Sequence, residues 1–153
     1  MIAGNTKETK ASNITERIPI SGMDINESQI IYIGKDSVPV SEEEYNLLLR
    51  VCMSECGGKY GEPLEGKIAV VETILNRCEI YDKSIEEVIY EPHQYSVADN
   101  GLPDETVEQA VDIALRESNY PDDMIYFRTG NYHSFGKPYQ QIGNHYFSLK
   151  ESD

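Results

Sequence analysis

The sequence contains no tryptophan and three cysteines, and basic residues are few: 13 Lys and Arg stand against 27 Asp and Glu. No apolar run approaches the roughly 20 residues that a membrane-spanning helix needs. The N-terminus has no short apolar core behind a basic start, so we recognise no signal peptide. The formal net charge of −14 predicts repulsion from nucleic acid and from anionic lipid. We therefore expect no nucleic-acid partner and no membrane insertion.

Patterns of metal sites and of nucleophilic hydrolases are also missing. The sequence has no C-x-x-C pair, H-E-x-x-H helix, Gly-rich phosphate loop or G-x-S-x-G elbow. Cys52 and Cys56 lie on one face of a predicted helix, where small thiols usually pack as apolar side chains. We rank packing ahead of a disulfide to Cys78, and a disulfide ahead of a metal site. The sequence thus predicts no metal and no cofactor.

The length of 153 residues fits one domain preceded by a polar segment. Residues 1–27 are rich in Thr, Asn, Ser, Lys and Glu and show no sustained hydrophobic period, which is typical of a mobile tail. Ile30–Ile33 is the short strand expected there. We therefore divide the chain into a tail, residues 1–40, and a folded domain, residues 41–153.

Local signals mark the first two helices of this domain. Ser41 and Glu44 form a capping box that opens a helix predicted over residues 42–56, and Gly57 ends it. A second helix is predicted over residues 62–77, with a proline in its first turn. This second helix is apolar on nearly every side, so we expect it at the centre of the core.

The remaining elements are shorter. Ser84 and Glu87 form another capping box, for a short helix, and residues 103–105 open a helix with acids in its first turn. Residues 124–127 have the composition of a strand. Together these elements predict a mainly α (α+β) fold, a small helical domain with a short strand or hairpin near its C-terminal third.

One acid has a distinctive position. Glu55 lies at the end of the first predicted helix, beside its apolar stripe and just before Gly57. A carboxyl group at the edge of an apolar core, facing an open loop, can keep its proton near neutral pH, which general acid catalysis needs. Most glutamates are solvated surface residues, so the position by itself suggests this chemistry without deciding it.

The C-terminal third is unusually aromatic. Flat rings mixed with Asn and Gln suit sugar binding, because rings cover apolar sugar faces and amides reach hydroxyls. For any single ring, packing in the core is the favoured alternative. For the set as a whole, the lining of a groove is a reasonable interpretation. The rings are those of Tyr126, Phe127, Tyr132, His133, Phe135, Tyr139, His145, Tyr146 and Phe147.

Four pieces of the chain form an ordered set of motifs. They are Ser54–Gly58 with Gly61–Val70 and Ile74–Arg77, Val88–Ser96, Ala110–Leu115, and Ile142–Phe147. In order and spacing they resemble the cell wall hydrolases of the spore cortex-lytic (SleB/CwlJ) type. That family typically reads A-E-A-R-G-E-P-Y-E-G-Q-x-A-V followed by I-L-N-R, then V-I-x-x-P…Q-F-S, and closes on I-G-x-H-x-F. The resemblance covers about residues 45–147.

The resemblance implies a lysozyme-like helical domain that cuts peptidoglycan between N-acetylmuramic acid and N-acetylglucosamine, with Glu55 as the catalytic acid. A glycosidase that hydrolyses its substrate ordinarily uses a second carboxylate. No motif fixes one in this chain, and Glu62, Glu72 and Asp99 are candidates. A lytic transglycosylase needs one carboxylate, which acts first as acid and then as base while a 1,6-anhydro ring closes. We prefer this route.

Six further residues are candidates for orienting the glycan. A structural role is the favoured alternative for Asn76, as a cap of a helix end, and for His145, as a lock on the C-terminal segment. The two roles are weighed evenly for Gln94 and Ser96. The candidates are Asn76, Gln94, Tyr95, Ser96, Tyr126 and His145.

Two departures from the family pattern flank the predicted site. Glu55 stands seven residues before Glu62, where the family usually has four, so the connection is about three residues longer. The arginine that the family has two residues after the acid is replaced by Gly57 in this chain. Because both changes lie beside the acid, we expect them to bear on substrate preference.

Two other functions remain open. One is an N-acetylmuramoyl-L-alanine amidase, which would use zinc held by His93, His133 or His145. The other is a non-catalytic binding module of a phage tail or a spore coat. The expected partner is a peptidoglycan glycan strand, and residues 1–40 are candidates for contact with a protein. The expected place of action is extracytoplasmic, on wall or cortex; with no signal peptide seen, the chain would be phage-borne, spore-associated or truncated.

Overall fold

The computed structural model describes residues 30–33, 39–57, 61–97 and 103–152, with the backbone alone for the first of these ranges. Residues 1–29 and 34–38 of the predicted tail, residues 58–60 between Gly57 and Gly61, and the candidate base Asp99 lie outside the described residues. The strand predicted at Ile30–Ile33 is present.

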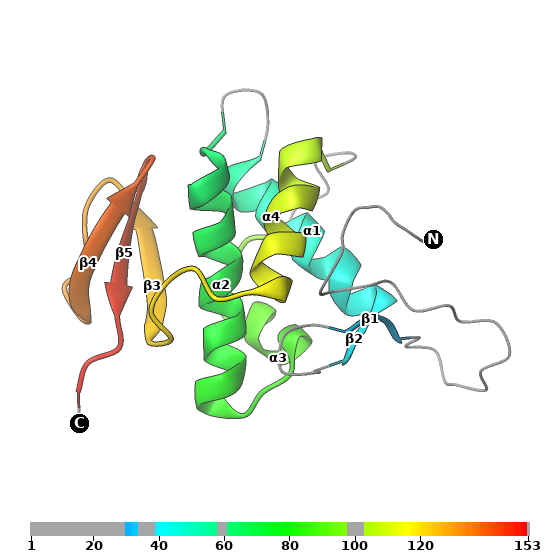
Figure 1. The fold of residues 1–153 in the computed structure, drawn as a ribbon. Coiled ribbons are helices and arrows are strands. Elements are labelled where there is room, and N and C mark those ends of the chain that lie inside the picture. Colours follow the sequence, from blue (N-terminus) through cyan, green and yellow to red (C-terminus); the bar gives the residue numbers. More distant parts are fainter. Residues whose placement is uncertain (1–29, 34–38, 58–60, 98–102, 153) are drawn as a thin grey trace, which may run out of the picture.

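Helices dominate the described part of the chain, and the predicted mainly helical α+β class is confirmed. Figure 1 shows α2 at the centre, with the β3-β5-β4 sheet on one side and α1 and α4 on the other. A second small sheet joins β1 to β2. The elements are β1 (Ile30–Ile33), β2 (Pro39–Ser41), α1 (Glu42–Cys56), α2 (Leu64–Tyr81), α3 (Ile85–Ile89), α4 (Glu105–Arg116), β3 (Met124–Thr129), β4 (Lys137–Ile142) and β5 (His145–Leu149).

The first helix has the bounds that the sequence predicts. Ser41 caps α1 through its side chain, which accepts the backbone N–H of Glu44, and the Glu44 side chain returns the bond to the Ser41 backbone. The same reciprocal pair is formed by Ser84 and Glu87 at α3. These two capping boxes determine where α1 and α3 begin, because each satisfies backbone donors that the first turn of the helix leaves unpaired.

The central helix is longer than predicted. Pro63 caps α2 rather than lying within its first turn, and the helix runs four residues past Arg77, to Tyr81. It ends where Asp82 adopts the left-handed conformation with φ 54° and donates its N–H to the Cys78 carbonyl. No Gly or Pro marks this end, and Asp is one of the few residues that tolerate left-handed backbone. Asn76 therefore lies inside the helix, and its predicted capping role is wrong.

The C-terminal third forms a three-stranded antiparallel sheet in the order β3-β5-β4. The sequence predicts a strand only around β3. The other two strands escape detection because β4 is exposed at five of its six positions and so has no hydrophobic alternation. Gly143, with φ +61°, occupies the first central position of the tight β4–β5 turn, where positive φ favours glycine.

All three cysteines are free thiols. Cys52 and Cys56 are buried on the inner face of α1, as the packing hypothesis predicts, and Cys78 is half-buried. The hydrogen bond with Cys52 and burial raise the pKa of Cys56 well above its ordinary value. Burial raises the pKa of Cys78 to about 12. At neutral pH both groups stay protonated, which makes them poor nucleophiles.

Candidate functional site

Glu55 lies in the last turn of α1, half-buried, where the helix leaves the core. Its Oε2 accepts the backbone N–H of Ser96 at 2.7 Å. The two serine hydroxyls of Ser54 and Ser96 share a second hydrogen bond of 2.6 Å. The segment after α3 is therefore held against the end of α1 by two contacts. One of them fixes the orientation of the Glu55 carboxyl group.

The central helix holds the same segment from the other side. Arg77 donates from Nη1 to Gln94 Oε1 at 2.6 Å and from Nε to the Ile125 carbonyl at 2.8 Å. Its guanidinium carbon lies 5.4 Å from the ring centre of Tyr95 and 5.6 Å from that of Tyr126. Both distances are within the range of cation–π attraction. Arg77 thus links the segment next to Glu55 with strand β3.

Tyr95 is anchored at its hydroxyl. Thr73 already donates its only hydroxyl proton to the Val70 carbonyl at 2.7 Å, so Tyr95 donates to Thr73 Oγ1 across 2.9 Å. Burial raises the pKa of Tyr95 to about 12, with Arg77 and Thr73 acting in the opposite direction. The phenol is therefore neutral at physiological pH, and its ring centre lies 5.9 Å from that of Phe127.

Glu62, a candidate second carboxylate, holds the tip of the β4–β5 hairpin. Its Oε1 accepts the Asn144 backbone N–H at 2.8 Å, and its Oε2 accepts the Asn144 side-chain amide at 3.2 Å. The backbone N–H of Glu62 also donates to the Cys56 carbonyl at 2.9 Å, which closes the connection after α1. A Cβ on Gly61 would collide with that carbonyl oxygen, so the closure requires glycine there.

His145 is 4% exposed and packs its ring 4.9 Å from Phe127. Its Nδ1 has no hydrogen-bond partner among the described residues. Burial lowers the pKa of His145, and the nearby Glu62 and Glu55 partly oppose that effect. The imidazole therefore lies close enough to both carboxylates to feel their charge, and it is held neutral by its apolar surroundings.

The other candidates occupy structural positions. Glu72 is buried and accepts three hydrogen bonds, from the backbone and side chain of Asn119 and from the Tyr120 backbone. Asn76 donates its side-chain amide to the Pro121 and Met124 carbonyls at 3.0 and 2.9 Å, which ties α2 to the start of β3.

The structure brings four of the predicted residues together with Glu55: Gln94, Tyr95 and Ser96 on one segment, and Tyr126 across Arg77. Sequence reasoning missed the two residues that organise them, Thr73 and Arg77. An arginine on the helix expected at the centre of the core was the available signal for Arg77, since a buried guanidinium must find acceptors.

The three histidines of the amidase hypothesis lie in different environments. His93 is exposed, with φ 63°. His133 donates from Nε2 to the Phe127 carbonyl at 3.0 Å, because a carbonyl oxygen can only accept. Within residues 39–57, 61–97 and 103–152, no group of three or more His, Cys, Asp or Glu is arranged to hold a metal ion.

Residues 61–148, more than half of the chain, match the profile of the Cell Wall Hydrolase family. The chain belongs to this family. The part of this cell wall hydrolase that matches the family profile begins at residue 61, six residues after Glu55. The spore cortex-lytic enzyme of Bacillus subtilis (strain 168) is 31% identical over an alignment of 102 positions, and the match covers 60% of this chain and 33% of that protein. The chain therefore spans about a third of the length of that curated relative.

Two solved structures share the fold of this cell wall hydrolase. The catalytic domain of the germination-specific lytic transglycosylase SleB from Bacillus anthracis superposes with a TM-score of 0.60 and 25% identity, over 71% of this chain and 95% of that domain. The catalytic domain of the Bacillus cereus SleB protein gives a TM-score of 0.58 and 24% identity, over 71% and 91%. The resemblance to the spore cortex-lytic type is confirmed.

Proposed function

We propose that the chain is a peptidoglycan-cleaving glycosidase that acts as a lytic transglycosylase between N-acetylmuramic acid and N-acetylglucosamine. Residues 41–153 form its catalytic domain in this proposal. Family membership supports cell wall cleavage, and the name of the Bacillus anthracis domain supports the transglycosylase route.

The observation that carries the proposal is the contrast between Glu55 and the two described candidates for a second carboxylate. Glu62 and Glu72 each accept hydrogen bonds from backbone and amide groups of the fold. Glu55 instead lies at the exit of a helix, where the Ser96 N–H holds one of its oxygens. A single oriented carboxyl group is what anhydro-forming cleavage needs.

The chemistry follows from this geometry. Because Oε2 accepts the Ser96 N–H, the transferable proton belongs on Oε1 of Glu55. Glu55 gives this proton to the glycosidic oxygen as the bond to the muramoyl C1 breaks and positive charge develops there. The resulting carboxylate takes the proton of the muramoyl C6 hydroxyl while O6 bonds to C1. The 1,6-anhydro ring closes and Glu55 is again protonated.

The proposed place of action is outside the cytoplasm, on cell wall or spore cortex, as the family description suggests. Among the described residues, no helix combines the length and apolarity that crossing a bilayer requires. Glycan strands are the proposed partner. The residues proposed to orient them are Ser96, which contacts Glu55, and Gln94, Tyr95 and Tyr126, which contact Arg77 beside it.

The test is digestion of purified peptidoglycan followed by mass spectrometry of the products. We expect anhydro-muropeptides, and a loss of at least about 10²-fold in rate for Glu55→Gln. Glu65→Gln is the matched control, since Glu65 is an exposed acid at the start of α2. Activity retained by a folded Glu55→Gln protein would overturn the assignment. Reducing-end products that still depend on Glu55 would replace the anhydro route with hydrolysis. Chelator-sensitive release of stem peptides would favour an amidase.

A further inference from the structure

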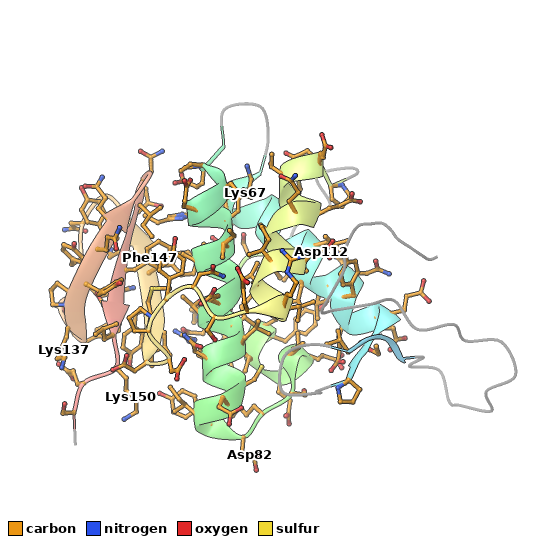
Figure 2. The ribbon with its side chains drawn as sticks, viewed as in Figure 1. Lys67, Asp82, Asp112, Lys137, Phe147 and Lys150 are labelled. Atoms are coloured by element: carbon orange, nitrogen blue, oxygen red, sulfur yellow. The ribbon has the colours of Figure 1, made fainter. Side chains whose placement is uncertain are left out.

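Charge is distributed unevenly between the helices and the sheet. Residues 124–150 contain three basic residues and no acid, a formal charge of +3. The other residues therefore carry −17 in a chain whose net charge is −14. Figure 2 shows Lys137 and Lys150 at one end of the sheet, whereas Asp82 and Asp112 lie on the helical side. Within the part of the chain that the structure describes, the sheet is thus a region of positive charge that suits an anionic polymer.

The register of the strands shows which face of the sheet is available. Phe127 pairs with Phe147, and both rings point to the inner face, where Phe147 is fully buried. Arg128 pairs with Tyr146, and alternation places both on the opposite, outer face. Arg128 is exposed.

The segment between β3 and β4 lies over this outer face and adds rings to it. The Phe135 ring stacks on His133 at 4.5 Å and meets Tyr126 edge-on at 4.9 Å. Tyr132 meets Tyr146 edge-on at 5.0 Å. We call these residues the outer patch: Tyr126, Arg128, Tyr132, His133, Phe135 and Tyr146. Phe135 is 45% exposed, which is unusual for a phenylalanine held in a ring stack.

The outer patch is continuous with the candidate active site. The Tyr126 ring faces the guanidinium of Arg77, whose other neighbour is the Tyr95 ring. Ser96, which follows Tyr95 in the chain, donates its backbone N–H to Glu55 Oε2. A row of rings and one cation therefore leads from the acid past the edge of β3 that packs on α2 to the outer patch.

We propose that the outer patch is a second docking surface for a peptidoglycan strand, with N-acetylhexosamine faces on Phe135 and anionic groups of the polymer on Arg128. This inference rests on the proposed function, because it names the same polymer as substrate. Rings supply contacts with sugar faces that do not depend on charge, and the absence of acids over residues 124–150 removes the repulsion that the helical side would impose on an anionic wall. The patch thereby orients the acidic protein with its sheet toward the wall.

The experiment measures binding to insoluble purified peptidoglycan by sedimentation, in a Glu55→Gln background so that no strand is cut. We expect Phe135→Ala and Arg128→Glu each to weaken binding about tenfold, and the Arg128→Glu effect to shrink at high salt. Tyr90→Ala and Arg50→Glu are matched controls, because Tyr90 is 56% exposed at the end of α3 and Arg50 is exposed on α1. These controls should bind within about twofold of the parent, as isolated surface changes usually do.

Equal binding by the patch variants and the parent would overturn the proposal. So would equal losses in the control variants, which would indicate a nonspecific effect of charge or surface change. Thermal unfolding checks that each variant is folded, and Arg128→Glu keeps the test decisive if Phe135→Ala is unstable. Binding through the outer patch and cleavage are tested separately. If the wild-type protein binds through the patch but forms no products, the proposed function is disproved and the docking surface is not.

Discussion

Ser96 donates its backbone N–H to Glu55 Oε2 across 2.7 Å, although the two residues are 41 positions apart in the chain. The bond joins the end of the first helix to a segment without regular structure. It also distinguishes the two carboxyl oxygens of Glu55, because the protein holds Oε2 and the proposed mechanism uses Oε1 for the proton. This pairing gives the candidate site its geometry, and its removal is the most direct mutational test of that geometry.

Substitution of Ser96 can separate the backbone donor from the side chain. Ser96→Pro removes the N–H and should lower the cleavage rate about 10²-fold, because a carboxyl group that is free to turn loses its aligned geometry. Ser96→Ala keeps the N–H and loses the hydroxyl pair with Ser54, so we expect a change of only a few-fold. Initial rates on peptidoglycan measure both. Equal rates in the two variants would show that the N–H does not position Glu55.

Arg77 connects the segment beside Glu55 to strand β3, so its substitution should affect both stability and activity. Arg77→Lys can keep at most one of the two directed hydrogen bonds and should cost about 2 kcal/mol of unfolding free energy. We expect kcat to fall more than KM rises, since the acid is displaced. Arg50→Gln, an exposed arginine on α1, should cost less than about 0.5 kcal/mol. A stable Arg77→Lys protein with full kcat would contradict this role.

Two features of the hairpin tip require glycine at position 143. Gly143 has φ +61°, and a Cβ there would collide with Glu62 Oε1. Gly143→Ala should therefore destabilise the fold by about 2–4 kcal/mol, from backbone strain and from the displaced carboxylate. Gly130→Ala is the control, because its φ is +95° but no atom lies within 4 Å of an added Cβ. We expect Gly130→Ala to lower the free energy of unfolding by about 1 kcal/mol, measured by urea unfolding. Similar losses in both would show that the Glu62 contact contributes nothing.

Stability should fall as the pH drops below about 6.5, the ordinary pKa of histidine, in part because of His145. Burial lowers the pKa of His145 in the folded protein, so below that pH the unfolded chain binds a proton that the folded protein does not. Proton uptake then favours unfolding. His145→Gln should flatten the dependence of unfolding free energy on pH between about 5 and 7. Urea unfolding across this range provides the measurement. A steeper dependence in His145→Gln would contradict a lowered pKa in the folded protein.

The starts of the helices could be predicted from sequence because their signals are local. Ser41 with Glu44, and Ser84 with Glu87, satisfy backbone donors within the same turn. The end of α2 could not be predicted, since it is set by the left-handed conformation of Asp82, with no Gly or Pro to mark it. The strands β4 and β5 also went undetected, because exposure of β4 on both faces removes the alternation that marks a half-buried strand.

Among the predicted site residues, those that follow each other in the chain were the most predictable. Gln94, Tyr95 and Ser96 belong to one segment and do lie beside Glu55 or its supporting arginine. Asn76 has a structural role, as favoured from the sequence, but not as a helix cap: its amide satisfies two carbonyls 45 and 48 positions away. Such partners are set by how helices and strands pack, and spacing within one helix carries no information about them.

The sequence by itself determined which segments become helices, that Glu55 would stand at the exit of the first one, and that the chain resembles wall hydrolases of the cortex-lytic type. These properties depend on capping, on periodicity and on motif order, all of which are written along the chain. Only the tertiary structure decided that Ser96 holds Glu55, that Arg77 lies between two tyrosine rings, and that Glu62 binds a hairpin tip 82 residues away. Those contacts join distant segments, and they form because carboxylate and guanidinium groups that packing removes from water, wholly or in part, need partners in the segments that pack against them.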